Sequence, residues 1–263
     1  MRSGISGRVA LVTGGSAGIG FAAAQVLAEE GAAVAFCARG GERLELAKAE
    51  LERRCPDATF EAIQADVTSV ESVQSLHQRT VTALGPVEIL VNNAGTSRRG
   101  PFLGMTDAQW QEDLDSKLLA AVRLSRLCIP EMRDHLWGRI INVTGVGGKT
   151  PRAVSTPTTV SRAAGIALTK ALSKEFGPDN ILVNAICIGT VESTQHERRW
   201  NRSGSELELG DYYRKVATER QVPVGRAGTA REAANVIAFL SSELADFVSG
   251  TAINVDGGQS AAT

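Results

Sequence analysis

The stretch Val9-Ala10-Leu11-Val12-Thr13-Gly14-Gly15-Ser16-Ala17-Gly18-Ile19-Gly20 decides the fold of this chain. Four apolar residues run directly into a glycine-rich turn, and a helical pattern follows as far as Gly31. Gly14 permits a tight turn, while Gly18 and Gly20 let the backbone approach a pyrophosphate and let the helix pack on a sheet. Free N–H groups at the start of that helix attract an anion. The stretch therefore predicts a dinucleotide-binding βαβ unit.

Six further apolar runs repeat the strand pattern along the chain, each separated from the next by a helical pattern. Continuous apolar strands between helices are typical of a parallel sheet that is covered on both faces. The predicted strands are Arg8–Thr13, Ala33–Ala38, Thr59–Gln64, Val87–Asn92, Arg139–Thr144, Ile181–Cys187 and Thr251–Val255. We therefore expect an α/β fold in which residues 1–263 form a single Rossmann-type doubly wound parallel sheet of about seven strands, with ligands at the carboxyl ends of the strands.

Helix boundaries follow from capping residues. Thr68, Thr106 and Thr229 are each followed three residues later by Glu or Gln, which predicts three capping boxes. Gly31 and Gly177 predict helix ends. The polar, charged stretch Val191–Leu209 is irregular and precedes a helical segment over Asp211–Thr218, so we expect a long loop there and a substrate-binding lid over 190–215.

Composition excludes several classes of protein. The chain has 263 residues, 43% of them hydrophobic, and a net charge of −1, so it has no electrostatic signature of nucleic-acid or membrane binding. Its four cysteines lack metal-ligand spacing and its three histidines are scattered, so we expect reduced core thiols and no metal site. The first seven residues lack an apolar signal core, and no segment is long and apolar enough to span a bilayer. We expect a cytoplasmic protein that acts on a small-molecule substrate.

The end of the second predicted strand addresses the choice of cofactor. An acidic residue near this point hydrogen-bonds the adenosine 2′-hydroxyl and selects NAD, whereas an arginine can meet a 2′-phosphate. The sequence here is Phe36-Cys37-Ala38-Arg39, with no acid at Cys37 or Ala38. Arg39 therefore favours NADP over NAD, although a solvated loop arginine is the alternative interpretation.

Motifs along nearly the whole chain resemble the short-chain dehydrogenase/reductase family, and within it the 3-oxoacyl-acyl-carrier-protein reductase branch. The matching pieces are Thr13–Gly20, Asp66-Val67, Asn92-Asn93-Ala94-Gly95, Gly138–Val143, Arg162–Lys174, Leu182-Val183-Asn184-Ala185 and Asn254-Val255-Asp256-Gly257-Gly258. The resemblance implies that Asp66 and Val67 contact the adenine and that Asn93, Ala94 and Gly95 line the cofactor cleft. It also implies a homotetramer or homodimer, with the last two helices and the last strand packed between subunits. Ser16, Ile19 and Ile188 complete the expected cofactor contacts.

The resemblance fails at the catalytic groups. The family uses a tyrosine, a lysine four residues later, a serine about thirteen residues before the tyrosine and an asparagine on the preceding long helix. In this sequence Thr158 stands at the tyrosine position, Arg162 at the lysine, Gly145 at the serine and Lys117 at the asparagine. The Pro-Gly pair that usually follows the sixth strand is Ile188-Gly189.

The replacements keep part of the chemistry. Arg162 remains a cation that can bind ribose hydroxyls, but arginine does not deprotonate in proteins and cannot shuttle a proton. Thr158 keeps a hydroxyl that is too weakly acidic to replace a phenol. Lys117 brings a new cation, and desolvation can pull the pKa of a lysine toward neutrality. The structural alternatives are a solvent-facing Lys117, a helix-starting Thr158 and a surface Arg162.

Three functional hypotheses follow. The first is an atypical NADP(H)-dependent oxidoreductase that interconverts a small carbonyl and an alcohol, with the proton supplied by Lys117, by a water that Arg162 holds, or by Tyr212, Tyr213 or His196. The second is a protein that binds NADP(H) without turnover, as a sensor or a silent subunit. The third is a lyase or isomerase that uses Lys117 as a base or Schiff-base amine.

Overall fold

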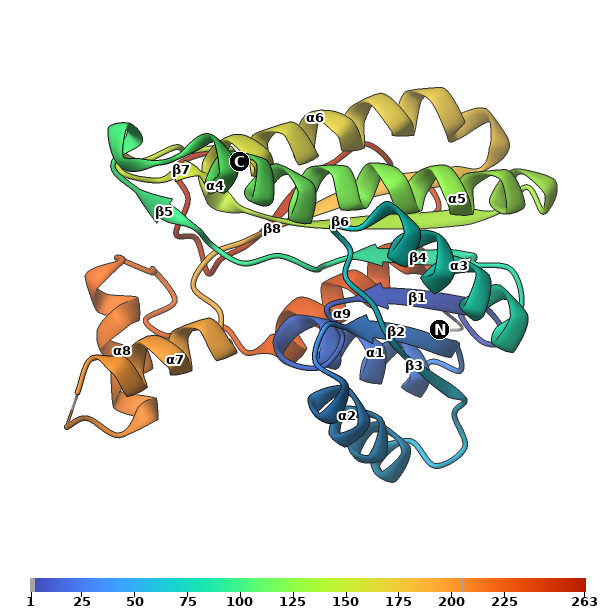
Figure 1. Ribbon diagram of the computed structural model, residues 1–263, viewed down its shortest axis with the longest axis horizontal. Coiled ribbons are helices and arrows are strands. Elements are labelled where there is room, and N and C mark those ends of the chain that lie inside the picture. The colour runs from blue at the N-terminus through green and yellow to red at the C-terminus, as the bar shows by residue number, and fades with distance from the viewer. Residues whose placement is uncertain (1–2, 205) are drawn as a thin grey trace.

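A computed structural model describes residues 3–204 and 206–263, and its centre is a seven-stranded sheet in which every neighbouring pair is parallel. The strand order is β3-β2-β1-β4-β6-β8-β9, which confirms the doubly wound α/β fold (Figure 1). The strands of this sheet are β1 (Val9–Thr13), β2 (Ala33–Ala38), β3 (Phe60–Gln64), β4 (Ile89–Asn92), β6 (Gly138–Gly145), β8 (Ile181–Ile188) and β9 (Ala252–Val255).

Helices cover both faces of the sheet (Figure 1). On one face lie α1 (Gly18–Glu29), α2 (Gly41–Arg54) and α9 (Ala230–Ser241). On the other face lie α3 (Val70–Leu84), α5 (Ala120–Asp134) and α6 (Thr158–Phe176). The chain enters α5 through α4 (Asp107–Leu114) and a π-helical turn at Asp115–Leu119. Single 3₁₀ turns lie at Phe102–Gly104, Val146–Gly148, Gly177–Asp179 and Glu243–Ala245.

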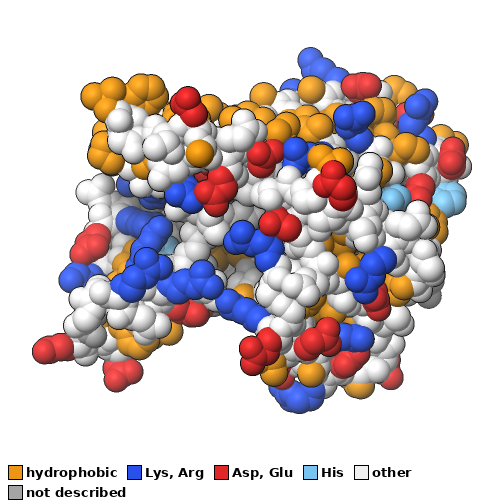
Figure 2. Space-filling model, in the orientation of Figure 1, with side chains coloured by type: hydrophobic (Ala, Val, Ile, Leu, Met, Phe, Trp, Pro, Cys, Tyr) orange, Lys and Arg blue, Asp and Glu red, His pale blue; other side chains and the backbone are white. Residues whose placement is uncertain are grey.

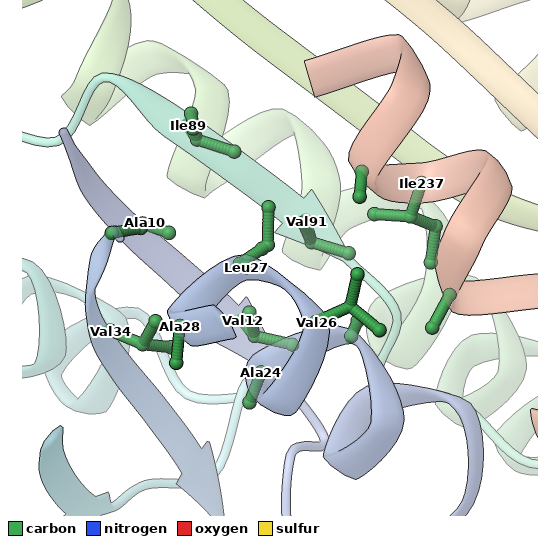
Figure 3. Packing of buried hydrophobic residues seen from close by; sticks show 14 of the residues in the cluster. Ala10, Val12, Ala24, Val26, Leu27, Ala28, Val34, Ile89, Val91 and Ile237 are labelled. Carbon is green, nitrogen blue, oxygen red and sulfur yellow. The ribbon is translucent and has the colours of Figure 1, made fainter. Parts of the chain in front are cut away.

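The alternation of side chains along each strand divides the core into two layers. In β1, Ala10 and Val12 pack toward α1 and α9, whereas Leu11 packs on the opposite face with residues of α3 and α5. Figure 3 shows the first layer, in which Val26 of α1 and Ile237 of α9 approach the strand residues. Because both faces of the sheet are covered, the strands are apolar throughout, as the sequence pattern indicated.

Two of the three predicted capping boxes are confirmed. At Thr106 and Thr229 the threonine hydroxyl accepts a hydrogen bond from the backbone N–H three residues on. The side chain of that later residue accepts a hydrogen bond from the backbone N–H of the threonine. The prediction at Thr68 was wrong by one residue, because Ser69 caps α3 by accepting from the Ser72 N–H. Thr68 instead donates to the Asp66 carboxylate, which competes for its hydroxyl.

Both predicted helix ends are confirmed, since α1 ends just before Gly31 and α6 ends at Phe176, next to Gly177, but the two glycines differ in conformation. Gly31 takes the left-handed conformation expected of a helix-terminating glycine, with φ +91°. Gly177 does not, because the chain continues through a 3₁₀ turn and turns at Asn180, whose φ is +58°. Asparagine tolerates this conformation better than other residues that carry a side chain.

The expected long loop over Val191–Leu209 was wrong, because one helix forms inside it, and a second helix begins at Leu209, close to the predicted helical segment Asp211–Thr218. They are α7 (Thr194–Arg202) and α8 (Leu209–Glu219), which form a lobe beside the body of the molecule (Figure 1). Ser193 caps α7 by accepting from the His196 N–H, and the Tyr213 hydroxyl of α8 accepts from the Ser193 N–H. The charged residues of α7 hid its helical character, because Trp200 is the single large apolar side chain among the nine residues of this helix.

A second, two-stranded sheet joins β5 (Arg99–Gly100) to β7 (Thr156–Pro157) beside the carboxyl ends of β4 and β6. The antiparallel pairing sets Arg99 opposite Pro157, directly before α6. Together with the α7–α8 lobe, this sheet walls the edge at which a doubly wound fold binds its ligands. Within the described ranges, no helix has the length and apolar character that crossing a membrane requires.

Candidate active site

The glycine-rich loop has the shape that close approach to a ligand requires. Gly14 and Gly18 take left-handed conformations, with φ +67° and +56°. A Cβ on Gly20 would lie 2.3 Å from the Gly14 carbonyl oxygen and 2.4 Å from Asn93 Nδ2, so only glycine fits there. Nothing lies within 4 Å of a Cβ on Gly18, which leaves room at the α1 N-terminus, and Ala17 provides no side-chain cap. These uncapped N–H groups and the open space fit a pyrophosphate.

Asn93 holds this loop in place from the end of the neighbouring strand β4. Its amide donates to the Thr13 carbonyl at 2.8 Å and to the Gly14 carbonyl at 3.2 Å. The backbone N–H groups of Asn93 and Ala94 both donate to the Thr13 hydroxyl at 2.9 Å. These hydrogen bonds therefore hold together the carboxyl ends of the neighbouring strands β1 and β4. The side chain of Asn93 positions the loop.

The residues expected at the adenosine end lie on adjacent connections. Arg39 is exposed after β2, and in the described part of the chain no carboxylate lies within ion-pair distance of it. Asp66 accepts hydrogen bonds from the Thr68 N–H and hydroxyl, at 2.9 and 2.8 Å, which lower its pKa against the opposing effect of burial. The Val67 side chain is buried in the core, so only its backbone faces outward.

A cleft of about 580 Å³ lies at the carboxyl edge of the sheet, between the β5–β7 sheet and the α7–α8 lobe. In Figure 2 it is a hollow bordered by Lys and Arg side chains. All four residues at the family's catalytic positions line it, and so do five of the expected cofactor residues. These lining residues are Gly145, Thr158, Arg162 and Lys117, with Ile19, Asn93, Ala94, Gly95 and Ile188. The remaining expected cofactor residues, Gly14, Ser16, Gly18, Gly20, Arg39, Asp66 and Val67, lie outside this cleft.

Lys117 lies in the π-helical turn and points into the protein. Its side chain is 7% exposed and forms an ion pair with Asp113, which is 2% exposed. Its stem fills the space beside Gly95, where a Cβ would lie 3.0 Å from Lys117 Cγ. Burial lowers the pKa of Lys117 to about 8, against the opposing effect of Asp113 and with a further decrease from Arg162. The structure thus excludes a solvent-facing Lys117.

Asp113 is a residue of this site that the motifs did not reveal. Besides the Lys117 ion pair, it accepts a hydrogen bond of 2.6 Å from the Ser161 hydroxyl on α6. Ser161 also donates to the Thr158 carbonyl at 3.0 Å. The spacing of Asp113 and Lys117, one turn apart on a predicted helix, was the available sequence signal. Burial of the pair could not be read from that spacing, since most such pairs are exposed.

Arg162 and Gly145 pack against each other across the floor of the cleft. A Cβ on Gly145 would lie 3.2 Å from Arg162 Cδ and 3.3 Å from the Ile188 carbonyl oxygen. The absence of a side chain at Gly145 therefore leaves the space that the long Arg162 side chain occupies. Burial lowers the pKa of Arg162 and the nearby Asp113 raises it, but a guanidinium stays charged in proteins.

Thr158 is the first residue of α6 and is only 3% exposed. Its buried hydroxyl has no hydrogen-bond partner among the residues that the structure describes. Buried hydroxyl groups are normally paired, because an unpaired one costs free energy. Thr158 lines the cleft, and its buried Oγ1 atom lies there without a hydrogen-bond partner in the described residues.

The two tyrosines do not reach this cleft. Neither Tyr212 nor Tyr213 lines it, and the Tyr213 hydroxyl is held between the N–H and the carbonyl of Ser193. His196 does line the cleft, but burial and the nearby Arg220, Arg199 and Arg99 lower its pKa to about 4. The imidazole is thus neutral near pH 7 and is a poor proton donor there.

The structure also brings together residues that no motif marked. Arg99, Arg152 and Arg220 line the same cleft as Lys117 and Arg162, although they come from separate segments of the chain.

The four cysteines are buried and unpaired. Within residues 3–204 and 206–263, no group of three or more His, Cys, Asp or Glu side chains is arranged to hold a metal ion.

Comparisons with known proteins agree with this geometry. Residues 14–260 match the family model described as enoyl-(acyl carrier protein) reductase. The 3-oxoacyl-[acyl-carrier-protein] reductase of Aquifex aeolicus is 33% identical over 97% of this chain and 98% of the relative. The acetoacetyl-CoA reductase of Rhizobium meliloti is 37% identical over 96% and 98% of the two chains.

Two solved structures are similar over nearly the whole chain. The NADPH-bound short-chain oxidoreductase of Pseudomonas aeruginosa PAO1, described as containing an atypical catalytic center, is 37% identical, with a TM-score of 0.93 over 99% of this chain and 100% of that one. The L-sorbose reductase of Gluconobacter frateurii, complexed with NADPH and L-sorbose, is 33% identical, with a TM-score of 0.94 over the full length of both chains. This chain therefore belongs to the short-chain dehydrogenase/reductase family.

Proposed function

We propose that this protein is an NADP(H)-dependent carbonyl reductase in which Lys117 replaces the tyrosine as proton donor. The observation that carries the proposal is the buried cluster of Lys117, Asp113 and Ser161, which opens on the cleft beside Arg162. Among the charged groups of the cleft, Lys117 alone combines burial, a fixed partner and a pKa near neutrality. A proton donor works best when its pKa lies close to the working pH.

The cofactor assignment rests on residues that fit NADP. The Gly14–Gly20 loop and the uncapped start of α1 would hold the pyrophosphate, and the unpaired Arg39 would hold the 2′-phosphate. NADPH in the Pseudomonas and Gluconobacter neighbours supports the same choice. When bound, NADPH supplies the hydride equivalent that a carbonyl carbon accepts.

The residues of the cleft divide the remaining work. Arg162 would bind the ribose hydroxyls with its planar fork and stabilise negative charge on the substrate oxygen. The unpaired Thr158 hydroxyl would donate a hydrogen bond to that oxygen. The Lys117 ammonium would then transfer one proton from Nζ to the oxygen, which yields the alcohol and a neutral amine. Water entering the open cleft would return the proton to Lys117.

Asp113 and Ser161 are positioning residues in this scheme. The Asp113 carboxylate draws the Lys117 ammonium to one place and raises its pKa against burial. Ser161 fixes the carboxylate and ties it to α6, which also carries Thr158 and Arg162. These contacts would thereby fix the position of the proton donor relative to the residues that hold the substrate oxygen.

The test replaces Lys117 and follows NADPH oxidation with a panel of ketones and aldehydes. We expect Lys117→Met to lower kcat by about 10²–10⁴-fold, the usual contribution of a general acid. NADPH affinity should stay within about 3-fold of the native value, because Lys117 contributes little to the affinity for the cofactor. Lys170→Met, on the exposed face of α6, is the matched control.

The pH profile identifies the donor. Reduction requires protonated Lys117, so kcat should fall as the pH rises through about 8, the pKa of this group in the folded protein. Lys117→Arg should move that limb to higher pH, since arginine keeps its proton. A native pH limb that survives in Lys117→Met would assign the proton to another group.

A second candidate function is binding of NADP(H) without turnover. It is favoured by the lack of a phenol in the cleft, where Thr158 replaces the tyrosine and the Tyr213 hydroxyl is bound to Ser193. Tight NADPH binding by pure protein that reduces no carbonyl of the panel would favour this function over the first.

We also propose that the protein assembles as a homo-oligomer through its last helical segments. Phe239 of α9, Leu244 and Phe247 are 44%, 46% and 103% exposed, which is costly for large apolar side chains that gather near one another in the sequence. Sedimentation equilibrium measures the assembly directly. Phe247→Ser should shift it toward the monomer.

A further inference from the structure

Basic side chains predominate among the charged residues that line the cleft. Six of its lining side chains are basic: Arg99, Lys117, Arg152, Arg162, Arg199 and Arg220. No Asp or Glu is among the lining residues in the described part of the chain. The whole chain, in contrast, is nearly neutral at −1. The cleft therefore carries a local excess of positive charge. Figure 2 shows Lys and Arg side chains along the hollow.

Lys117 and Arg162 have a place in the proposed reaction, but the other four arginines do not. They come from four different segments: Arg99 from β5, Arg152 from the loop before β7, Arg199 from α7 and Arg220 from the end of α8. The fold brings these four segments together around the cleft. Arg99 and Arg152 are exposed, whereas Arg199 and Arg220 are half-buried. Four separate segments that each contribute a guanidinium to one cleft indicate a site for negative charge.

Across residues 3–204 and 206–263, none of these four guanidiniums forms an ion pair with a carboxylate. Arg99 donates to the Ser97 hydroxyl at 2.9 Å, and Arg220 donates to the Thr190 hydroxyl at 3.4 Å. Outside the cleft, some arginines in the described ranges are paired, as Arg226 is with Glu232, whereas others such as Arg39 are not. What distinguishes the four cleft arginines is that they line one space and that no carboxylate in the described residues is paired with any of them.

These arginines also repel one another. Burial and the nearby Arg199 and Arg152 lower the pKa of Arg99, and burial with Arg99 and Arg199 lowers that of Arg220. His196 lies among them, 7% exposed, and its Nδ1 atom has no hydrogen-bond partner in the described residues. An uncompensated cluster with an unpaired buried nitrogen costs free energy, which an anion supplied from outside offsets.

We propose that the substrate carries, besides its reacting carbonyl, an anionic group such as a carboxylate or phosphate, which Arg99, Arg152, Arg199 and Arg220 bind. This inference rests on the proposed reductase function and names its substrate class. The reacting end points toward Thr158, because the β5–β7 pairing sets Arg99 opposite Pro157, one residue before it. A compact substrate therefore spans the anion site and the proton donor.

The phosphates of the cofactor do not account for this cluster. The elements that fit them are the Gly14–Gly20 loop, the start of α1 and Arg39. All four arginines lie instead on β5, the loop before β7 and the α7–α8 lobe, which are separate from the β1–α1 connection.

The first arm of the test measures anion binding without any turnover. Protein saturated with NADPH is titrated with inorganic phosphate or succinate at constant ionic strength, and the saturable rise of Tm gives an apparent Kd. We expect Arg199→Gln to weaken binding by about 10-fold and Arg152→Gln with Arg199→Gln by about 100-fold, since each charged hydrogen bond contributes about that factor. The control is Arg198→Gln, the exposed neighbour on α7, which should leave the Kd unchanged.

The second arm measures turnover with matched neutral and anionic carbonyls. Dihydroxyacetone is compared with its phosphate ester, and levulinate with its methyl ester, which also separates phosphate from carboxylate recognition. We expect kcat/KM to favour the anionic member by about 10-fold or more, and Arg199→Gln to remove that preference while the neutral member is unaffected.

The outcomes separate this inference from the function on which it rests. Saturable binding that depends on Arg199 but not on Arg198, with no carbonyl reduced, supports the anion site and overturns the reductase. Reduction of neutral and anionic members at equal rates, without saturable anion binding, overturns the anion site alone. Displacement of NADPH by the anion would assign the binding to the cofactor phosphates and also overturn the inference.

Discussion

The proposed cofactor side, at the glycine-rich loop, and the proposed substrate side, at the cleft, are built in opposite ways. The cofactor side is one continuous stretch, β1 to β2, in which Gly20 fits under the Gly14 carbonyl and Asn93 closes the loop from β4. The substrate side has no such stretch, because its charged groups come from α4, the π-turn, α6, β5 and the α7–α8 lobe. The first side can therefore be predicted from one short stretch of sequence, whereas the second side is visible only in the folded structure.

The difference extends to how each side carries charge. The cofactor side uses backbone N–H groups and a single exposed arginine, Arg39. The substrate side contains a buried ion pair, Lys117 with Asp113, and arginines that no carboxylate compensates within the described residues. Backbone donors carry no net charge, whereas buried charges must be compensated by the groups around them. Three substitutions use this contrast.

The largest effect is expected on the substrate side, at Asp113. Asp113→Asn leaves the Lys117 ammonium buried without a counter-charge, and breaking a buried pair this way costs about 3–5 kcal/mol of unfolding free energy. The measurement is chemical denaturation near pH 7. Asp115→Asn breaks the more exposed pair with Arg123 and should cost at most about 1 kcal/mol. Equal costs for the two variants would contradict the difference between the sides.

Lys117 also gives this prediction a pH signature. Its pKa is lowered in the folded protein, so between about pH 8 and the ordinary value of a lysine the unfolded chain binds the extra proton. The free energy of unfolding should therefore rise with pH in that window. Lys117→Met should flatten the rise, while Lys170→Met should leave it in place.

The next effect is expected on the cofactor side, at Gly20. In Gly20→Ala the new methyl group meets the Gly14 carbonyl oxygen at 2.3 Å, so the backbone of the loop must move. Such overpacking costs about 1–3 kcal/mol, which corresponds to roughly 10–100-fold in NADPH affinity. A fluorescence titration with NADPH measures it. Gly210→Ala is the control, because nothing lies within 4 Å of a Cβ at that position. Native affinity in Gly20→Ala would mean that the loop is not the pyrophosphate site.

The smallest effect is expected at Arg39, which sharpens the choice between the two cofactors. Arg39→Ala should weaken NADPH by about 10-fold, since one exposed charge-assisted contact is lost. NADH affinity should stay within about 2-fold, because NADH lacks the 2′-phosphate. Arg43→Ala, exposed on α2, should change neither value. Parallel losses for NADPH and NADH would assign Arg39 a structural role.

Much of the fold was predictable, because its signals are local. The seven predicted strands match the seven of the parallel sheet to within about two residues at each end, since continuous apolar runs of strand length require burial on both faces. The errors fell where local signals compete. Ser69 and Thr68 could each cap α3, and the polar sequence of α7 concealed a helix that Ser193 and Tyr213 hold.

The sequence by itself determined the doubly wound sheet, the glycine loop and the absence of a tyrosine where the family has one. Each depends on residues that are close together in the chain. Only the tertiary structure decided that Lys117 is buried against Asp113 and Ser161, and that Arg99, Arg152, Arg199 and Arg220 share one cleft. The physical reason is that burial and electrostatic coupling depend on distance in space. The segments that meet here are far apart in the chain, as Arg99 and Arg220 show.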